Sequence, residues 1–371
     1  MREEALMPFD VHVHPRSDGG IDLLASAGPA GVWGQANDTC DASLLARIQE
    51  CRADLDDDDR NGAAPGAPPV DRPHHHLWWC AQHGANVFRA LLPDKVQDLY
   101  RTCLEQARRK GQTLSIRVRY NGTTDRQLHD VPWELAFDPD EQQFLALWPE
   151  TCLARYLHMP HAERPVQNGP RRLLLTMAKS TPQPEDFKDE CARIGAVTRR
   201  VIQPTTSYVT GSTEIWQRLT SARDGARSFL AWHHVGHGRM REETGKFALE
   251  FNRDGRDVYE TSLADLVAAV AQSGIRCAVL NICYSGRTAG LATAIASANV
   301  PIVIGHRTAV YDRAAVSFAA TLWRELAAGS PAELAIRTAR MSILSKGWGS
   351  QWVLPMLFVR TNNTHLVEED A

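Results

Sequence analysis

The sequence lacks any strong excess of charge of one sign. Its 371 residues include 41 Lys and Arg against 44 Asp and Glu, giving a formal net charge of −3 and a pI near 6.5. Proteins that bind nucleic acid or anionic membranes usually carry a basic patch or a high pI. The charge balance therefore gives no electrostatic support for either kind of partner.

Long hydrophobic runs are also missing. No uninterrupted apolar stretch reaches the roughly 18 residues that a membrane-spanning helix needs. The opening MREEALMPFDVHVH has no apolar core of a secretory signal. The eight cysteines show no repeated spacing, and a chain of this length buries a core without disulfides. We therefore expect reduced thiols and a cytoplasmic protein.

The first half of the chain mixes short strand and helix patterns, and no internal repeat is visible. An acidic run followed by Pro, Gly and Ala predicts an exposed loop at about 54–73. Residues 85–110 have helical spacing, with Pro93 as a break or first-turn residue. A second loop, at 159–170, separates this half from the next. These breaks place the boundary between two domains, 1–168 and 169–371.

The second half alternates apolar strands with helices. RRLLLTMA, RCAVLNIC and VPIVIG read as buried strands, and amphipathic or apolar helical segments lie between them. QWVLPMLFVR reads as a last strand. Such alternation predicts an α/β fold with a mostly parallel sheet that is covered on both faces.

Two of these strands end on residues that carry chemistry. AWHHVGHGRM places His237 between two glycines, and LNICYSG places Cys283 at a strand-to-helix turn. Functional groups gather at the carboxyl edge of a parallel sheet. A hairpin, a helix and a strand separate the two groups, so we expect their strands to be neighbours.

A cysteine and a histidine at one edge form a nucleophile and a base. The imidazole takes the thiol proton, and the thiolate attacks a carbonyl carbon. The glycines leave room for the backbone of a peptide substrate. The N–H groups of Gly238 and Cys283 are candidates for an oxyanion hole.

HHVGHG, LNICYSG and VPWELAFDP together resemble the signatures of the CHAT family of caspase-like cysteine peptidases. Further stretches before the Pro-Trp-Glu motif and after the cysteine extend the resemblance over nearly the whole chain. The resemblance implies a caspase-like α/β sandwich in 169–371, preceded by a smaller, inactive caspase-like half in 1–168. Pro132, Trp133 and Glu134 would then have a structural role in that first half.

The resemblance also assigns roles to residues of the second half. It implies that His237 is the general base, Cys283 the nucleophile and Gly238 an oxyanion donor. Supporting roles fall on three further residues: His233, Asn281 and Ser285.

Two positions bear on specificity. Metacaspases carry an acidic residue two positions before the cysteine, where it helps bind a basic side chain. Asn281 stands there, so this position does not support cleavage after Arg or Lys. In caspases the stretch equivalent to His306 and Arg307 lines the substrate groove. Arg307 could favour an acidic or polar residue there, or form a surface salt bridge.

The predicted activity is that of an endopeptidase without metal or cofactor, acting on a protein substrate. The resemblance implies regulation by a sensor or partner protein and a setting in bacterial defence or programmed cell death. We expect a latent resting state, with the loop at about 54–73 as a possible lid. Two rival functions remain: a catalytically silent scaffold that binds a partner, and a thiol transpeptidase or acyltransferase.

Other histidines permit other interpretations. His233 and His237 lack nearby acidic or cysteine ligands at a spacing typical of zinc sites, and a buried structural role is the alternative. Asp10, His12 and His14 mimic the first metal strand of amidohydrolases, whose (β/α)₈ barrel does not match the remaining strands. The segment from His74 to Cys80 is either a binding patch or a loop edge beside a helix.

Overall fold

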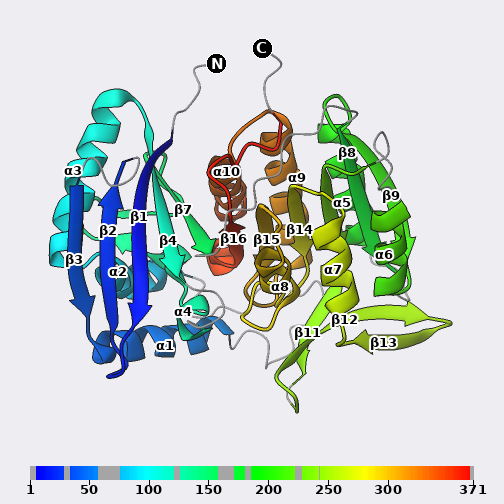
Figure 1. Ribbon diagram of the computed structural model, residues 1–371, viewed down its shortest axis with the longest axis horizontal. Helices are drawn as coiled ribbons and strands as arrows, with labels where there is room; N and C mark the ends of the chain where they lie inside the picture. Colours follow the sequence, from blue (N-terminus) through cyan, green and yellow to red (C-terminus); the bar gives the residue numbers. More distant parts are fainter. Residues whose placement is uncertain are drawn as a thin grey trace. The chain divides into compact units, whose positions relative to one another are not determined.

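The computed structural model describes residues 6–28, 34–56, 76–120, 126–157, 171–179, 185–221, 228–241 and 243–367. The chain divides into two compact units, one of Met1–His158 with Leu344–Val353 and one of Met159–Ile343 with Leu354–Ala371. Both are mixed α/β (Figure 1). The predicted loop at 159–170 and the predicted boundary after residue 168 lie outside the described residues. So does the acidic loop beyond residue 56.

The first unit contains a five-stranded sheet in the order β3-β2-β1-β4-β7. β1, β4 and β7 are parallel, whereas β1, β2 and β3 pair antiparallel. The alternation in β1 follows the two-residue period of a strand, because Phe9, Val11 and Val13 are buried between exposed or half-buried neighbours. The strands are β1 (Leu6–Pro15), β2 (Ile21–Ala27), β3 (Gly34–Cys40), β4 (Thr113–Tyr120) and β7 (Thr151–Leu157).

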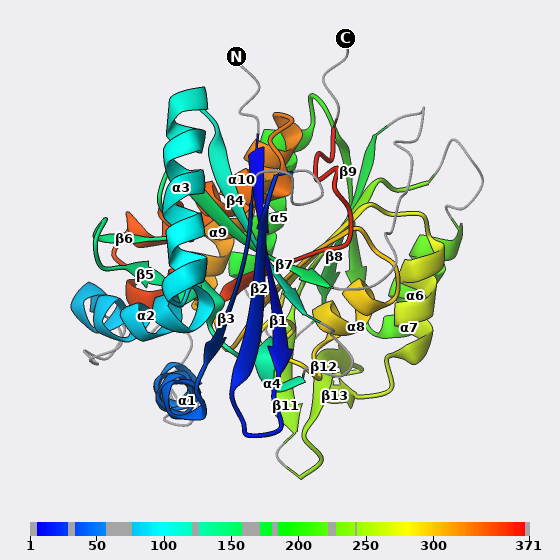
Figure 2. The same ribbon diagram turned by 60° about the vertical axis from the view of Figure 1, so that its left-hand side comes forward.

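The helix predicted at 85–110 is two helices, and the predicted break at Pro93 is confirmed. Pro93 caps the second helix, where its missing N–H costs no hydrogen bond, but the first helix begins earlier, at Leu77. Figure 2 shows the second, α3, lying along the sheet of this unit. The remaining elements are α1 (Ala42–Asp56), α2 (Leu77–Leu91), α3 (Asp94–Lys110), α4 (Arg126–His129), β5 (Phe137–Asp138), β6 (Gln143–Phe144) and the 3₁₀ turns η4 (Trp133–Leu135) and η6 (Gly349–Val353).

The second unit contains a six-stranded sheet in the order β9-β8-β10-β14-β15-β16. The first five strands are parallel, and only β16 pairs antiparallel. The mostly parallel sheet is therefore confirmed. The strands are β8 (Arg172–Ala178), β9 (Gln203–Val209), β10 (Ala231–Val235), β14 (Cys277–Asn281), β15 (Ile302–His306) and β16 (Pro355–Val359). The last predicted strand is shorter than expected: its beginning forms η6, and β16 begins at Pro355, a strand position that tolerates proline.

Helices cover both faces of the second sheet, as its wholly buried strands require. α5 (Glu185–Thr198) and α9 (Asp312–Ala327) pack on each other on one face. The opposite face carries α6 (Ser212–Ser221), α7 (Ala264–Gln272) and α8 (Leu291–Ser297) (Figures 1 and 2). The unit is completed by α10 (Ala332–Leu344) and a small antiparallel sheet of β11 (His237–Arg241), β12 (Lys246–Arg253) and β13 (Arg256–Glu260). Within the described ranges, no helix is long and apolar enough to cross a membrane.

Candidate active site

His237 stands where the chain leaves the parallel sheet. β10 ends at Val235, and after Gly236 the hairpin strand β11 begins with His237. A side chain at position 236 would bring a Cβ to 2.9 Å from the Cβ of Ala178, so glycine is needed for this close exit. His237 is half-buried, and its ring lies 5.0 Å from that of Phe187, centroid to centroid.

Cys283 stands in a tight turn after β14. Tyr284, the next residue, has φ 62°, a left-handed conformation that costs a non-glycine residue roughly 1–2 kcal/mol. The buried hydroxyl of Ser285 stabilises the turn, because it donates to the carbonyl of Ile282 at 2.8 Å and accepts from the N–H of His306 at 3.0 Å. Ser285 thus holds the turn of Cys283 against the end of β15.

Gly238 brings the two segments together. β10 and β14 are neighbours in register, with Val235 opposite Asn281. A Cβ on Gly238 would lie 2.8 Å from the carbonyl oxygen of Cys283 and 2.6 Å from a methyl carbon of Ile282. The residue after His237 therefore packs directly on the backbone of the cysteine turn, and only glycine fits there.

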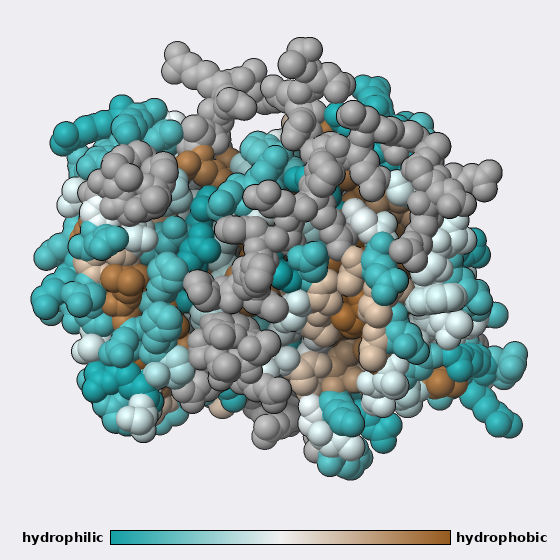
Figure 3. Space-filling model, in the orientation of Figure 1, coloured by the Kyte–Doolittle hydropathy of each residue, from teal (hydrophilic) through white to brown (hydrophobic). Residues whose placement is uncertain are grey.

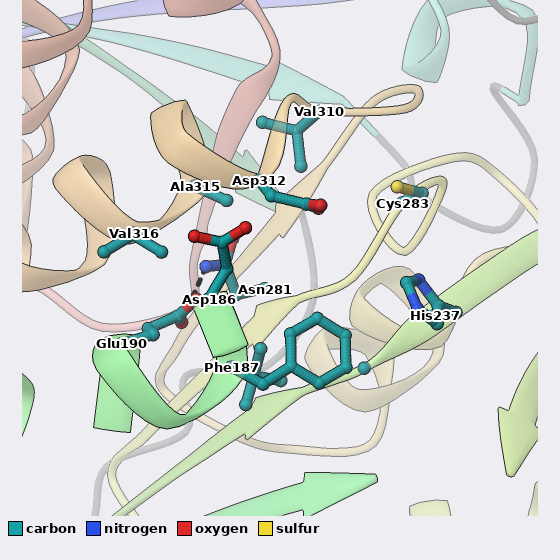
Figure 4. A pocket seen from close by; sticks show the side chains of 12 residues that line it. Asp186, Phe187, Glu190, His237, Asn281, Cys283, Val310, Asp312, Ala315 and Val316 are labelled. Atoms are coloured by element: carbon teal, nitrogen blue, oxygen red, sulfur yellow. Dashed lines mark hydrogen bonds between the residues drawn. The ribbon is translucent and has the colours of Figure 1, made fainter. Parts of the chain in front are cut away.

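His237 and Cys283 line the same pocket, as Figure 4 shows. The pocket holds about 320 Å³ of space, including the solvent at its mouth. Its walls come from the first turns of α5 and α9 and from the ends of β10 and β14. Cys283 and His237 lie on one side of it, and the thiol points into the space between the walls. The predicted pair thus lies at the carboxyl edge of neighbouring strands.

A buried hydrogen-bond network lies behind the pocket. The indole N–H of Trp323 donates to Nδ1 of His233 at 3.1 Å, so the proton of this imidazole is on Nε2, which donates to Oε1 of Glu190 at 2.7 Å. The amide of Asn281 donates to the same oxygen at 2.7 Å. His306 Nε2 donates in turn to Oδ1 of Asn281 at 2.5 Å. The network fixes the strand end that leads into Cys283.

The outer predicted groove residues do not reach the pocket. His306 and Arg307 are buried, at 0% and 2% exposure, and neither lines it. Burial, together with the nearby His233, lowers the pKa of His306 to about 3, so this imidazole is neutral. The pKa of His234 is also lowered to about 3 by burial and by His233.

Three acidic pocket residues were not identified from the sequence: Asp186, Glu190 and Asp312. For Glu190 a signal was present. In α5 the residues on the buried side include Phe187, Cys191 and Ile194, and Glu190 falls on the same side. A carboxylate at a core position of an amphipathic helix marks a site that has a partner or a function.

Asp312 begins α9 and faces the pocket (Figure 4). Burial raises the pKa of its carboxyl group, His237 acts in the opposite direction, and the nearby Asp186 and Glu190 raise it further. The pocket therefore concentrates negative charge beside the histidine.

The other histidine motifs have structural explanations. Asp10 forms an ion pair with Arg119 at 2.6 Å, and the rings of His12 and His14 stack. Over the described ranges no cluster of His, Cys, Asp and Glu is arranged to hold a metal ion. His76 stands directly before α2, which agrees with the interpretation of the segment from His74 to Cys80 as a loop edge beside a helix. All eight cysteines are thiols rather than disulfides.

A second hollow in the same unit is apolar. It is lined by small and aliphatic residues of α7 and α8, such as Val267, Leu291 and Ala294. Figure 3 shows hydrophobic residues gathered on this face of the molecule. Its described lining contains no histidine, cysteine or carboxylate, so the pairing of a thiol with an imidazole is found in the first pocket.

Comparisons with known proteins agree with this architecture. None of the curated sequences compared with the chain matches it. A crystal structure of the Saccharomyces cerevisiae separase–securin complex at 3.0 Å is similar, with a TM-score of 0.52 and 10% identity. A second structure of that complex, at 2.6 Å, gives a TM-score of 0.49, also at 10% identity. Each match covers 95% of this chain and 30% of the other, so the chain spans less than a third of that protein.

At this identity the structural likeness concerns the fold alone, and it supports the predicted caspase-like α/β class. The family is shown by the sequence itself. The model of the CHAT domain matches residues 93–351, which include β10, the cysteine turn and the Pro-Trp-Glu motif. With this match over most of its length, the chain belongs to the CHAT domain family.

Proposed function

We propose that the protein is a cysteine endopeptidase in which His237 and Cys283 form the catalytic pair. One observation carries the proposal: both side chains line one pocket at the ends of two neighbouring parallel strands. Membership of the CHAT family and the caspase-like fold support a cysteine-protease scaffold.

The mechanism follows from the roles of these groups. His237 takes the proton of the Cys283 thiol, and the thiolate attacks the carbonyl carbon of the scissile peptide bond. The N–H groups of Gly238 and Cys283 stabilise the negative oxygen of the tetrahedral intermediate. His237 then protonates the leaving amine, and water, activated by the same imidazole, hydrolyses the thioester. The products are a carboxylic acid and an amine, and the thiol is regenerated.

The test compares the unaltered chain with Cys283→Ala and His237→Ala on a mixed protein library, with new N-termini identified by mass spectrometry. In a preparation whose latency has been relieved, we expect cleavage by the unaltered chain and a loss of at least about 10³-fold in either variant, because a catalytic pair acts as a unit. A latent chain leaves the library intact but keeps a Cys283 thiol that reacts faster than a buried one. A buried cysteine such as Cys277 serves as the control, since Cys277→Ala removes a thiol outside the pocket. Equal cleavage by Cys283→Ala would overturn the proposal.

The same experiment separates the rival functions. An intact library together with a Cys283 thiol that reacts no faster than a buried one favours a silent scaffold. Products joined to an added amine, without uptake of water, favour a transpeptidase or acyltransferase.

The family resemblance extends the proposal to its setting. On this basis the peptidase is regulated and cleaves a few protein targets after activation by a sensor or partner. Its setting is bacterial defence or cell death. A cytoplasmic location agrees with eight cysteines that are all thiols.

A further inference from the structure

The pocket beside Cys283 contains acidic groups, and no lysine or arginine is among its described lining residues. Asp186, from the first turn of α5, and Asp312, from the first turn of α9, both face it (Figure 4). Neither carboxylate forms an ion pair or hydrogen bond with a described residue. The charged groups that act on Asp312 are His237, which lowers the pKa of its carboxyl group, and Asp186 and Glu190, which raise it. Like charges placed together at low solvent exposure are unfavourable unless a positive group joins them.

Glu190 strengthens this point because it is almost fully buried, at 1% exposure, and still lines the pocket. Both of its hydrogen bonds, from His233 and Asn281, are to Oε1. Oε2 has no hydrogen-bond partner among the described residues. Because Glu190 lines the pocket, a donor group of a ligand bound there can reach this second oxygen.

A bare metal ion does not fit this arrangement. The three carboxylates come from different turns of two helices, and in the described part of the chain no acidic group is arranged for metal coordination. A guanidinium or ammonium group at the end of a long side chain satisfies acceptors that are spread more widely, because it carries several donors.

We infer that Asp186, Glu190 and Asp312 bind the basic side chain, arginine or lysine, of the substrate residue that precedes the cleaved bond. This inference rests on the proposed function, since it places that residue beside Cys283. The negative charge comes from α5 and α9 and not from position 281, where the sequence has Asn281. Asn281 instead orients Glu190 through its amide.

A purely structural explanation exists for two of the three acids. Asp186 and Asp312 lie in first turns, where the helix dipole stabilises negative charge without any ligand. That explanation predicts no dependence of substrate choice on these carboxylates. It also does not apply to Glu190, which lies beyond the first turn of α5.

The test uses the full chain and two peptides that differ only in charge at the position before the cleaved bond, one with arginine and one with its neutral isostere citrulline. We expect kcat/KM to favour arginine by at least about tenfold, the effect of one close, partly desolvated charge pair. Asp312→Asn should reduce this ratio severalfold, because the arginine peptide loses more of its kcat/KM than the citrulline peptide does. Asp189→Asn is the control, because Asp189 lies on α5 between Asp186 and Glu190 but pairs with Arg193 on the surface.

A binding measurement makes the inference independent of turnover. The same peptides are titrated into Cys283→Ala and followed by calorimetry. Tighter binding of the arginine peptide, lost in Asp312→Asn, supports the inference even if the unaltered chain cleaves nothing, in which case only the proposed function fails. Cleavage dependent on Cys283 but equal for both peptides overturns the inference and leaves the proposed function standing. Equal binding of both peptides without any cleavage also overturns the inference.

Discussion

The two units each bury a glutamate, and they treat it in opposite ways. In the first, Glu134 of the Pro-Trp-Glu motif faces Arg155, with side-chain exposures of 1% and 0%. Arg155 donates to both carboxylate oxygens, at 2.8 and 2.5 Å, and also to the carbonyls of His129 and Val131. Although burial works against the charged guanidinium, Glu134 holds the pKa of Arg155 above its ordinary value. Both buried charges, the Glu134 carboxylate and the Arg155 guanidinium, are therefore neutralised by each other.

In the second unit, Glu190 has no arginine or lysine partner among the described residues; its hydrogen bonds come from an imidazole and an amide. His233 and Asn281 share one of its oxygens, and the other is left to the pocket. The comparison teaches that a buried carboxylate with a complete set of internal partners is structural. One with an unused oxygen beside a nucleophile is available for a ligand.

The largest expected effect comes from breaking the complete pair. Glu134→Gln leaves the Arg155 guanidinium buried without an opposite charge and should lower the free energy of unfolding by about 3–5 kcal/mol. Urea denaturation measures the loss, and hydrogen exchange of peptides from β7 assigns it to the first unit. The control is Glu150→Gln, which breaks a partly exposed pair with Arg108; since Arg108 keeps its pair with Glu141, the change should cost less than about 1 kcal/mol. Equal losses in the two variants would contradict the comparison.

The second effect is a pH dependence of stability that comes from two buried imidazoles. His234 and His306 have pKa values of about 3 in the folded chain, against about 6.5 when unfolded. Below pH 6.5 these two histidines bind protons in the unfolded chain but not in the folded chain. Stability should therefore fall as pH falls from 6.5 toward 3, by about 1.4 kcal/mol per pH unit for each histidine.

Urea midpoints at pH 7 and pH 5 measure this slope. His306→Gln keeps a donor toward Asn281 and removes one titrating group, so the slope should become about half as steep. An unchanged slope in this variant would show that His306 does not contribute to the pH dependence of stability.

The smallest effect on stability is expected at the second glutamate. Glu190→Gln keeps an oxygen that accepts from His233 and Asn281, so the free energy of unfolding should change by only about 1 kcal/mol. The preference for arginine over citrulline should fall nevertheless, because the free oxygen becomes an amide. A loss of stability as large as that of Glu134→Gln would mean that Glu190 is structural.

Several features were predictable from local sequence. The two-residue alternation in β1, the break at Pro93 and the strand–helix alternation of the second half all appear as expected. The placement of His237 and Cys283 at one sheet edge was also predictable, because parallel neighbouring strands end on the same side. These predictions depend on local periodicity and on one general property of parallel sheets.

The acidic wall of the pocket was not predictable in this way. Asp186 and Asp312 lie far apart in the sequence, and each resembles an ordinary first-turn acid. They face the same pocket only because α5 and α9 pack together on one face of the sheet. Glu190 offered a hint by its position, but its partners come from β10 and β14.

The sequence by itself determined the family, the α/β class and the two residues most suited to nucleophilic catalysis, because these depend on motifs and on periodicity along the chain. Only the tertiary structure decided that Glu134 is paired with an arginine and that Glu190 keeps a carboxylate oxygen available to a ligand. Electrostatic compensation depends on distances between side chains from different elements, and these distances are set when the helices pack on the sheet.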